Sequence, residues 1–131
     1  MQVLKFGGTS VGSPERMRRV GELIDDGLPK IVVLSAVSGT TNKLVELSEL
    51  IRKQQIEVAS IKLAALREEY RVFVNELLPV EPFQERGHTV VRAIFDGMEQ
   101  LLWVHRIEAS HEKWILGQGK VITTKLFQIY L

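Results

Sequence analysis

The apolar and polar positions along the chain predict two short strands separated by a helix. Residues 2–6 are apolar enough for a buried strand, and residues 31–34 form a continuous β-branched run typical of a central parallel strand buried on both faces. Between them, Ser13 and Pro14 predict the N-cap and first residue of a helix, which we expect to end at Asp26-Gly27. This order predicts a βαβ unit with parallel strands and a right-handed crossover.

The middle of the chain carries the three-and-four spacing of amphipathic helices. A first helix follows residue 40, and two long ones are predicted at about 57–77 and 85–107, with a proline-containing break over 78–82. We expect the two long helices to pack as an antiparallel hairpin. Its predicted role is a layer over one flank of the sheet or, less favoured, part of a subunit contact.

The last segment is predicted to turn at the glycines of residues 117–119 and then to enter a helix. Ile122, Leu126 and Ile129 would form its inner face. The apolar pattern is still running at Leu131, without a glycine cap or a polar tail, and we therefore expect a truncated domain.

Composition narrows the class of protein. The 131 residues are 45% hydrophobic and 25% charged, which predicts one folded domain, and the net charge of +1 gives no reason to expect nucleic acid or an anionic membrane as a partner. The absence of cysteine excludes disulfides, cysteine nucleophiles and thiolate metal sites, and fits a reducing compartment. No apolar run approaches the ~20 residues of a membrane span. The expected location is the cytoplasm.

The histidines and tryptophans give no sign of a metal or nucleic-acid site. His88, His105 and His111 lack the i, i+4 spacing of a helical metal pair, so we expect surface or interhelix positions and no metal ligands in this chain. Trp103 and Trp114 have no basic groove interleaved with them. Packing in the core or at an interface is therefore favoured over base stacking.

The stretch with the clearest chemistry follows the first strand. Gly7 and Gly8 allow the backbone to turn sharply and to approach a ligand, and successive backbone amides there could form an anion-binding nest. Lys5 supplies a positive charge, and Thr9 and Ser10 supply hydroxyl groups. These groups predict phosphate binding, against the alternative of an ordinary glycine turn. The spacing is neither the Rossmann nor the P-loop pattern.

A second loop follows the second predicted strand. Because ligands of parallel sheets collect beyond the carboxyl ends of the strands, we expect residues 35–42 to lie beside the glycine turn. The hydroxyl-rich residues 38–41 then stand at a helix N-terminus, where backbone amides favour an anion. The alternative is plain N-capping by Thr40 or Thr41.

The amino-acid sequences of three blocks resemble those of the aspartokinases, within the wider amino acid kinase family. Residues 5–11 (KFGGTSV) are similar to the opening signature of that family, and residues 32–42 (VVLSAVSGTTN) to its second strand and loop. The pair of segments 117–119 (GQG) and 123–127 (TTKLF) resembles its third glycine turn and helix start. The blocks stand in the right order and span the chain.

The resemblance implies a fold and an activity. The fold would be α/β, a three-layer α/β/α amino acid kinase-like (carbamate kinase-like) domain with a mainly parallel sheet. Residues 1–131 would be its N-terminal, acceptor-side portion, with 57–107 as a helical hairpin insertion. The enzyme would transfer the γ-phosphoryl group of ATP to the side-chain carboxylate of L-aspartate, giving 4-phospho-L-aspartate, the first step of lysine, threonine and methionine biosynthesis. We expect this activity only in a full-length enzyme.

The resemblance also assigns roles to residues. Lys5 would act in catalysis at the phosphates, Gly7 and Gly8 would cradle those phosphates, and Thr9 and Ser10 would lie between nucleotide and acceptor. The aspartate pocket would be lined by Ser35, Ala36 and Thr41. The implied cofactors are ATP and Mg²⁺, with most Mg²⁺ and adenine contacts outside this chain, and the implied partners are the two substrates and further copies in a homo-oligomer.

One position departs from the family pattern. Where the family has Gly-Glu, with the glutamate pairing with the amino group of the substrate, this chain has Gly119-Lys120. A lysine there would repel an ammonium group and attract a carboxylate.

Two alternatives stay open. One is a different amino acid kinase, acting on glutamate, N-acetylglutamate or carbamate. The other is a non-catalytic anion-binding or assembly module, which Lys120 would favour.

Overall fold

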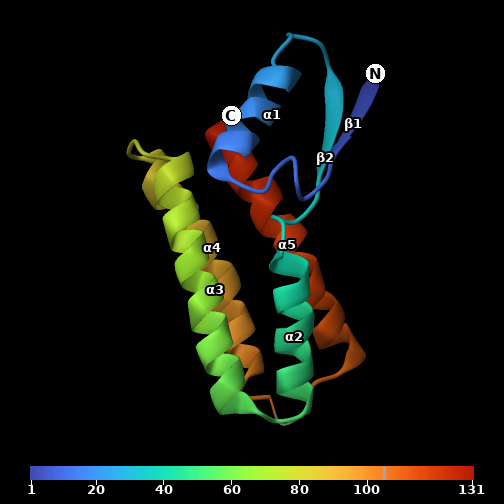
Figure 1. Cartoon of the computed structure of the whole chain (residues 1–131), viewed down its shortest axis with the longest axis vertical. Coiled ribbons are helices and arrows are strands. Elements are labelled where there is room, and N and C mark those ends of the chain that lie inside the picture. The colour runs from blue at the N-terminus through green and yellow to red at the C-terminus, as the bar shows by residue number, and fades with distance from the viewer. Residues whose placement is uncertain (105) are drawn as a thin grey trace.

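The structure is a computed structural model that describes residues 1–104 and 106–131. Its elements, in chain order, are β1 (Gln2–Phe6), α1 (Pro14–Ile24), β2 (Lys30–Leu34), α2 (Thr40–Arg52), α3 (Ile56–Leu77), α4 (Phe83–Leu101) and α5 (Ala109–Tyr130). Figure 1 shows two parts. The strands and α1 lie at one end of the molecule together with both termini, and α2 to α5 run away from them as a bundle.

The predicted βαβ unit is confirmed in its order and strand direction. β1 and β2 pair in parallel, with Val3 opposite Ile31. The hydroxyl oxygen of Ser13 accepts a hydrogen bond from the backbone N–H of Arg16 at 3.2 Å, so Ser13 is the N-cap that the sequence predicts. The helix ends earlier than expected, at Ile24.

The prediction that both strands are buried is wrong. Val3, Ile31 and Val33 are 63%, 49% and 45% exposed, whereas Leu34 is buried and Phe6 is half-buried against the core. In the described residues the sheet has two strands, and β2 packs on α5 on the covered side. The other face is open to solvent. The expected three-layer arrangement is therefore not confirmed, although the α/β character is.

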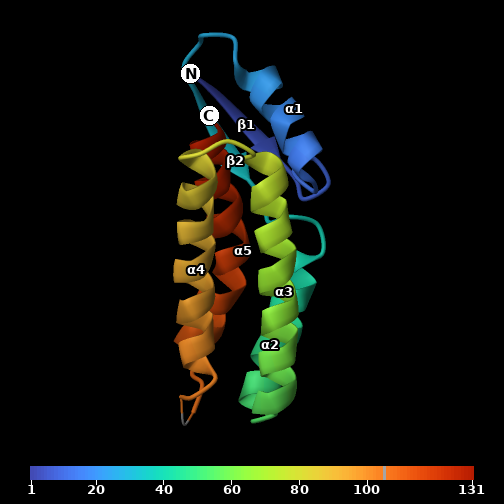
Figure 2. The ribbon, with the colours of Figure 1, turned by 90° about the vertical axis from the view of Figure 1, so that its left-hand side faces the viewer.

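The two long helices were expected to form a layer over the sheet, but they do not. They pack with α2 and α5 into a four-helix bundle, in which α2 touches α3 and α5, and α4 touches α3 and α5. Figure 2 shows α3 and α4 side by side along the bundle. Buried side chains from all four helices form its core: Leu44, Leu47, Leu63, Leu66, Phe95, Met98, Ile115 and Ile122. The hairpin joins the bundle because α2 and α5 also present apolar faces that need cover.

Two predicted helix boundaries are corrected. α4 ends at Leu101, not at residue 107, and α5 begins at Ala109, well before the glycines at which a turn was predicted. The backbone N–H of Glu108 donates to Nδ1 of His111 at 3.0 Å, in a capping box that starts α5 early. Gly117 and Gly119 consequently lie inside the helix, where each costs about 1 kcal/mol relative to alanine.

The expected interhelix role of histidine is confirmed at His88, whose Nε2 lies 2.8 Å from Oδ1 of Asn75 on α3. His105 lies outside the described residues.

Trp114 packs over α4, since a Cβ on Gly97 would lie 3.0 Å from its ring. Trp103 is 75% exposed, so it does not pack in the core, and an interface position for it stays a prediction. Among the described helices, none combines the length and the apolar character that crossing a membrane requires.

Candidate active site

The three blocks singled out in the sequence meet at Ala36, directly after β2. A Cβ atom on Gly8 would lie 2.9 Å from the carbonyl oxygen of Ala36, so the first loop can approach this closely only with glycine. On the other side, a Cβ atom on Gly119 would lie 2.8 Å from Cβ of Ala36 and 3.3 Å from Cγ2 of Thr40. The loops after β1 and β2 and the middle of α5 therefore form one junction, which we call the Ala36 junction.

The glycine turn uses part of its own hydrogen-bonding capacity. The amides of Ser10 and Val11 donate to the carbonyl oxygen of Gly7 at 3.0 and 3.3 Å. These two donors are therefore not free for the predicted anion nest. Nη1 of Arg16 donates to the carbonyl oxygen of Thr9 at 3.0 Å. The side chain of Arg16 is exposed, and it adds a positive charge beside the turn.

Lys5 is exposed on β1, opposite Val33. Alternate residues of a strand share a face, so Lys5 shares the open face of the sheet with Val3. It lies one residue before Phe6, whose carbonyl oxygen accepts a hydrogen bond from the N–H of Ser35 at 3.0 Å. This bond brings the start of the second loop beside the end of β1.

The second loop places its hydroxyl groups differently from the prediction. Gly39, with φ of +86°, is the N-cap of α2, so the alternative of N-capping by Thr40 or Thr41 is wrong. The hydroxyl oxygen of Thr40 instead lies 2.8 Å from the hydroxyl oxygen of Tyr70 on α3, and both side chains are buried. Thr41 is exposed in the first turn of α2, and Ala36 is buried.

Tyr70 is a residue of the junction that sequence reasoning missed. A buried tyrosine hydroxyl needs a hydrogen-bond partner, but this rule does not say which residue supplies it. Burial raises the pKa of Tyr70 to about 12. The phenol is therefore neutral across the physiological range and can hold Thr40 by a hydrogen bond.

Comparison with known proteins adds the decisive observation. The chain is 33% identical to "Aspartokinase 2, chloroplastic" of Arabidopsis thaliana and 32% identical to an aspartokinase of Chlamydia trachomatis, in both cases over 98% of its own length. The chain is a relative of the aspartokinases. No protein-family model matches it. It spans only 24% and 27% of the length of these two relatives.

Solved aspartokinase structures agree with this relationship. E. coli aspartokinase III in complex with lysine and aspartate matches all of this chain with a TM-score of 0.76 and 27% identity, over 28% of its own length. The same enzyme in complex with aspartate and ADP matches 97% of this chain with a TM-score of 0.69 and 26% identity, again over 28% of its own length.

The position that departs from the aspartokinase pattern lies on α5. Lys120 is exposed, whereas its neighbour Gly119 faces Ala36 and Thr40. The glycine turn expected there is instead regular helix, in which consecutive side chains point about 100° apart. Lys120 thus lies beside the junction and is not packed into it.

The donor set at the Ala36 junction suits an anion better than a cation. Arg16, hydroxyl groups and backbone amides supply its polar groups, and Lys5 stands one residue before the end of β1, whereas Mg²⁺ prefers carboxylate and other oxygen ligands. Across the described residues, no three His, Cys, Asp or Glu side chains cluster as metal ligands. The Mg²⁺ implied by the aspartokinase resemblance does not fit these residues.

Proposed function

We propose that this chain forms the acceptor-side part of an aspartate kinase. Two observations support the proposal: the three aspartokinase-like blocks converge at the Ala36 junction, and the chain matches aspartokinases along nearly its whole length. The meeting of the three blocks at the Ala36 junction is the main support for the proposal. Both matched E. coli structures contain aspartate, and one also contains ADP.

The proposed reaction is an in-line phosphoryl transfer. A side-chain carboxylate oxygen of L-aspartate forms a bond to the γ-phosphorus of ATP, and the bond between that phosphorus and the β,γ-bridging oxygen breaks. ADP leaves with the electron pair, and the product is 4-phospho-L-aspartate. Since no proton has to move, the protein must chiefly position the reactants and stabilise negative charge on the phosphoryl oxygens.

The residues take roles that fit these two tasks. Lys5 contacts the phosphates, and the glycine turn with Thr9 and Ser10 cradles them. Ser35, Ala36 and Thr41 border the aspartate side. The turn needs glycine on its Ala36 side, where the backbones are closest, and the Tyr70 hydroxyl holds Thr40 in place at the start of α2. Arg16 supplies a second cation near the phosphate position.

Isothermal titration calorimetry with the 131-residue chain tests the proposal. We expect aspartate to bind, and Lys5→Met to weaken the binding of ADP while leaving aspartate binding unchanged. Binding of phosphate and other bare anions without aspartate would instead favour a non-catalytic anion-binding module. We expect no aspartate-dependent ATP consumption by the chain alone, because it spans about a quarter of its relatives.

Position 120 gives a sharper test of the aspartate side. Lys120→Glu restores the family's carboxylate, and we expect it to strengthen aspartate binding by attracting the ammonium group of the substrate. Lys125→Glu is the matched control, since it makes the same charge change at another exposed position on α5. If the two variants bind aspartate equally, position 120 has no role in recognition.

A further inference from the structure

We propose that a hollow at the far end of the bundle binds a small organic anion with an apolar body. The hollow has a volume of about 560 Å³ and lies where α2 ends, α3 begins and α4 ends. It is separated from the Ala36 junction by the length of α2, about 20 Å for 13 residues. The proposal is therefore independent of the proposed kinase function.

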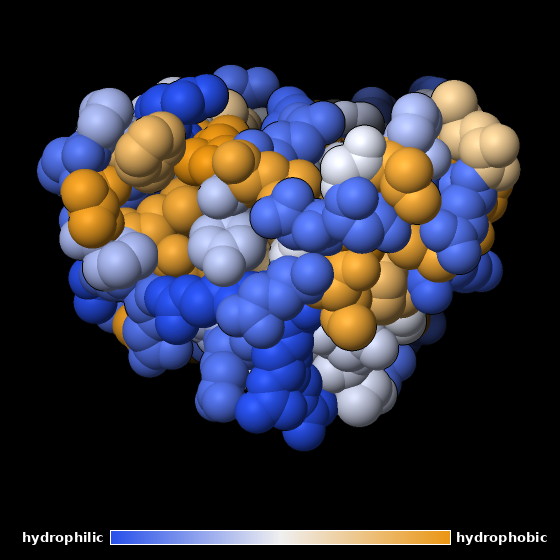
Figure 3. Space-filling view, turned by 90° about the horizontal axis from the view of Figure 1, so that it is seen from above, coloured by the Kyte–Doolittle hydropathy of each residue, from blue (hydrophilic) through white to orange (hydrophobic). Residues whose placement is uncertain are grey.

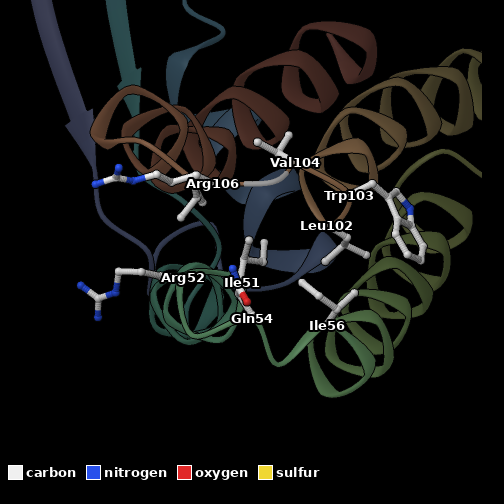
Figure 4. Close-up of a pocket in the computed structure, with 9 residues that line it drawn as sticks. Ile51, Arg52, Gln54, Ile56, Leu102, Trp103, Val104 and Arg106 are labelled. Carbon is white, nitrogen blue, oxygen red and sulfur yellow. The ribbon is translucent and has the colours of Figure 1, made fainter.

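The floor of this hollow is apolar. Ile51 and Leu102 are buried there at 4% and 3% exposure, and Ile56 is half-buried at the start of α3. Figure 4 shows these three side chains between the two rims. A ligand seated on them would remove apolar surface from water, which favours a hydrocarbon or aromatic body.

One rim of the hollow is cationic. Arg52 ends α2, Arg106 precedes α5, and Figure 4 shows both guanidinium groups extending in the same direction, outward from the apolar side chains at the floor. Arg52 lies 3.5 Å from a carboxylate oxygen of Glu49, and both side chains are more than half exposed, so water screens this pair strongly. Guanidinium groups bind carboxylate, sulfonate or phosphate oxygens through paired N–H donors. The rim thus selects a negative head group.

The opposite rim carries Trp103, whose side chain is 75% exposed. Figure 4 shows the indole on the side away from the two arginines. An indole face offers a large, rigid surface for stacking, and tryptophan and arginine are enriched among the residues that dominate binding at protein interfaces. Apolar floor, cationic rim and aromatic rim together describe a site for a planar organic carboxylate or sulfonate.

A second hollow, between α3 and α4, lacks this character although it also contains arginines. Arg71 there donates to a carboxylate oxygen of Glu68 at 2.6 Å, and Arg92 donates to one of Glu85 at 2.6 Å. Their mutual hydrogen bond raises the pKa of Arg71 and lowers that of Glu68. The positive charges of that hollow are already matched within the protein.

The test uses 8-anilinonaphthalene-1-sulfonate, which combines a sulfonate with an aromatic body. The dye is titrated into the 131-residue chain, and its fluorescence and energy transfer from tryptophan are recorded. We expect saturable binding that weakens about threefold in each of the single variants Arg52→Gln and Arg106→Gln. Trp103→Ala should also weaken it. Lys53→Gln is the control, because it removes the same charge next to Arg52 outside the hollow.

Two further measurements make the outcome decisive. Circular dichroism of each variant shows whether the helices persist, and Arg106→Lys keeps the charge while removing the guanidinium fork. Weaker binding in Arg106→Lys with unchanged helicity supports the proposal. Equal affinities in the arginine variants and in Lys53→Gln would overturn it, since the dye would then sense only net charge. Neither result of the dye titration changes the interpretation of the aspartate calorimetry that tests the proposed kinase function.

Discussion

The open sheet at one end and the four-helix bundle differ in how each holds its side chains. In the bundle, Phe95, Met98 and Ile115 are fully buried, whereas Val3 on the sheet is 63% exposed. Seen from the sheet end, the surface carries groups of hydrophobic side chains among hydrophilic ones (Figure 3). Tightly packed interiors supply most folding free energy, so the bundle stabilises the chain while the strands and their loops carry the candidate chemistry.

The Ala36 junction lies where these two parts meet. Val11, Met17, Val20 and Leu34 share the buried core with the bundle. The sheet end also meets the bundle at Gly119 against Ala36, at Tyr130 against Gly21, and where the guanidinium of Arg18 donates to the carbonyl oxygen of Glu76. A loop that must hold a ligand benefits from a rigid support. The comparison therefore predicts that substitutions in the bundle destabilise the whole chain, and that substitutions at the sheet end act locally.

The largest expected effect comes from two phenylalanines. Phe95→Ala should lower the free energy of unfolding by about 3–5 kcal/mol, because its ring is fully buried and packs on Tyr70 with centroids 5.9 Å apart. Phe6→Ala, at a half-buried position on β1, should cost roughly half as much. Urea denaturation followed by circular dichroism measures both. Equal losses would contradict the difference between the two parts.

The next effect concerns Tyr70 and pH. Its pKa is raised to about 12 by burial, from 10.0 for an unburied phenol. The folded state binds the proton more tightly, so this stabilisation is complete below pH 10 and is lost as pH rises toward 12. The loss reaches about 3 kcal/mol at 1.36 kcal/mol per pKa unit. The free energy of unfolding should fall more steeply above pH 10 in the natural chain than in Tyr70→Phe. If the free energy of unfolding fell equally steeply with pH in both proteins, Tyr70 would be excluded as the cause of the loss.

Local signals in the sequence predicted the elements that depend on neighbouring residues. Ser13 and Pro14 marked the start of α1, and the three-and-four spacing marked α3. Helix caps and amphipathic faces depend only on residues that are close together in the sequence. The parallel pairing of β1 and β2 also followed from the order of elements. The aspartokinase relationship could be recognised from the three blocks alone.

Other features could not be predicted because they depend on packing between distant segments. The glycines of residues 117–119 look like a turn, and only the contact with Ala36 explains Gly119 inside a helix. The bond between Thr40 and Tyr70 joins residues 30 positions apart, and no local pattern signals it. The exposure of Val3, Ile31 and Val33 depends on which elements cover the sheet, which a strand pattern does not reveal.

A smaller effect tests the contact between the two parts. Gly119→Ala should destabilise the chain by about 1–3 kcal/mol, since the added methyl group meets Ala36 and Thr40. Gly117→Ala is its control in the same helix: no atom lies within 4 Å of the added carbon, so a gain of about 1 kcal/mol in helix propensity is expected. Thermal unfolding measures the opposite signs. Stabilisation by both substitutions would mean that α5 does not pack tightly on the loop.

The smallest effect separates local from global opening at the sheet end. Ser13→Ala removes the hydroxyl that caps α1 and should cost about 1 kcal/mol. Because α1 belongs to the less buried part, we expect hydrogen exchange to speed up about fivefold in α1 and little in α4. Ser60→Ala, at an exposed position inside α3, is the control and should change neither. Equal acceleration in α1 and α4 would mean that the sheet end opens only together with the bundle, so that the two parts form a single cooperative unit.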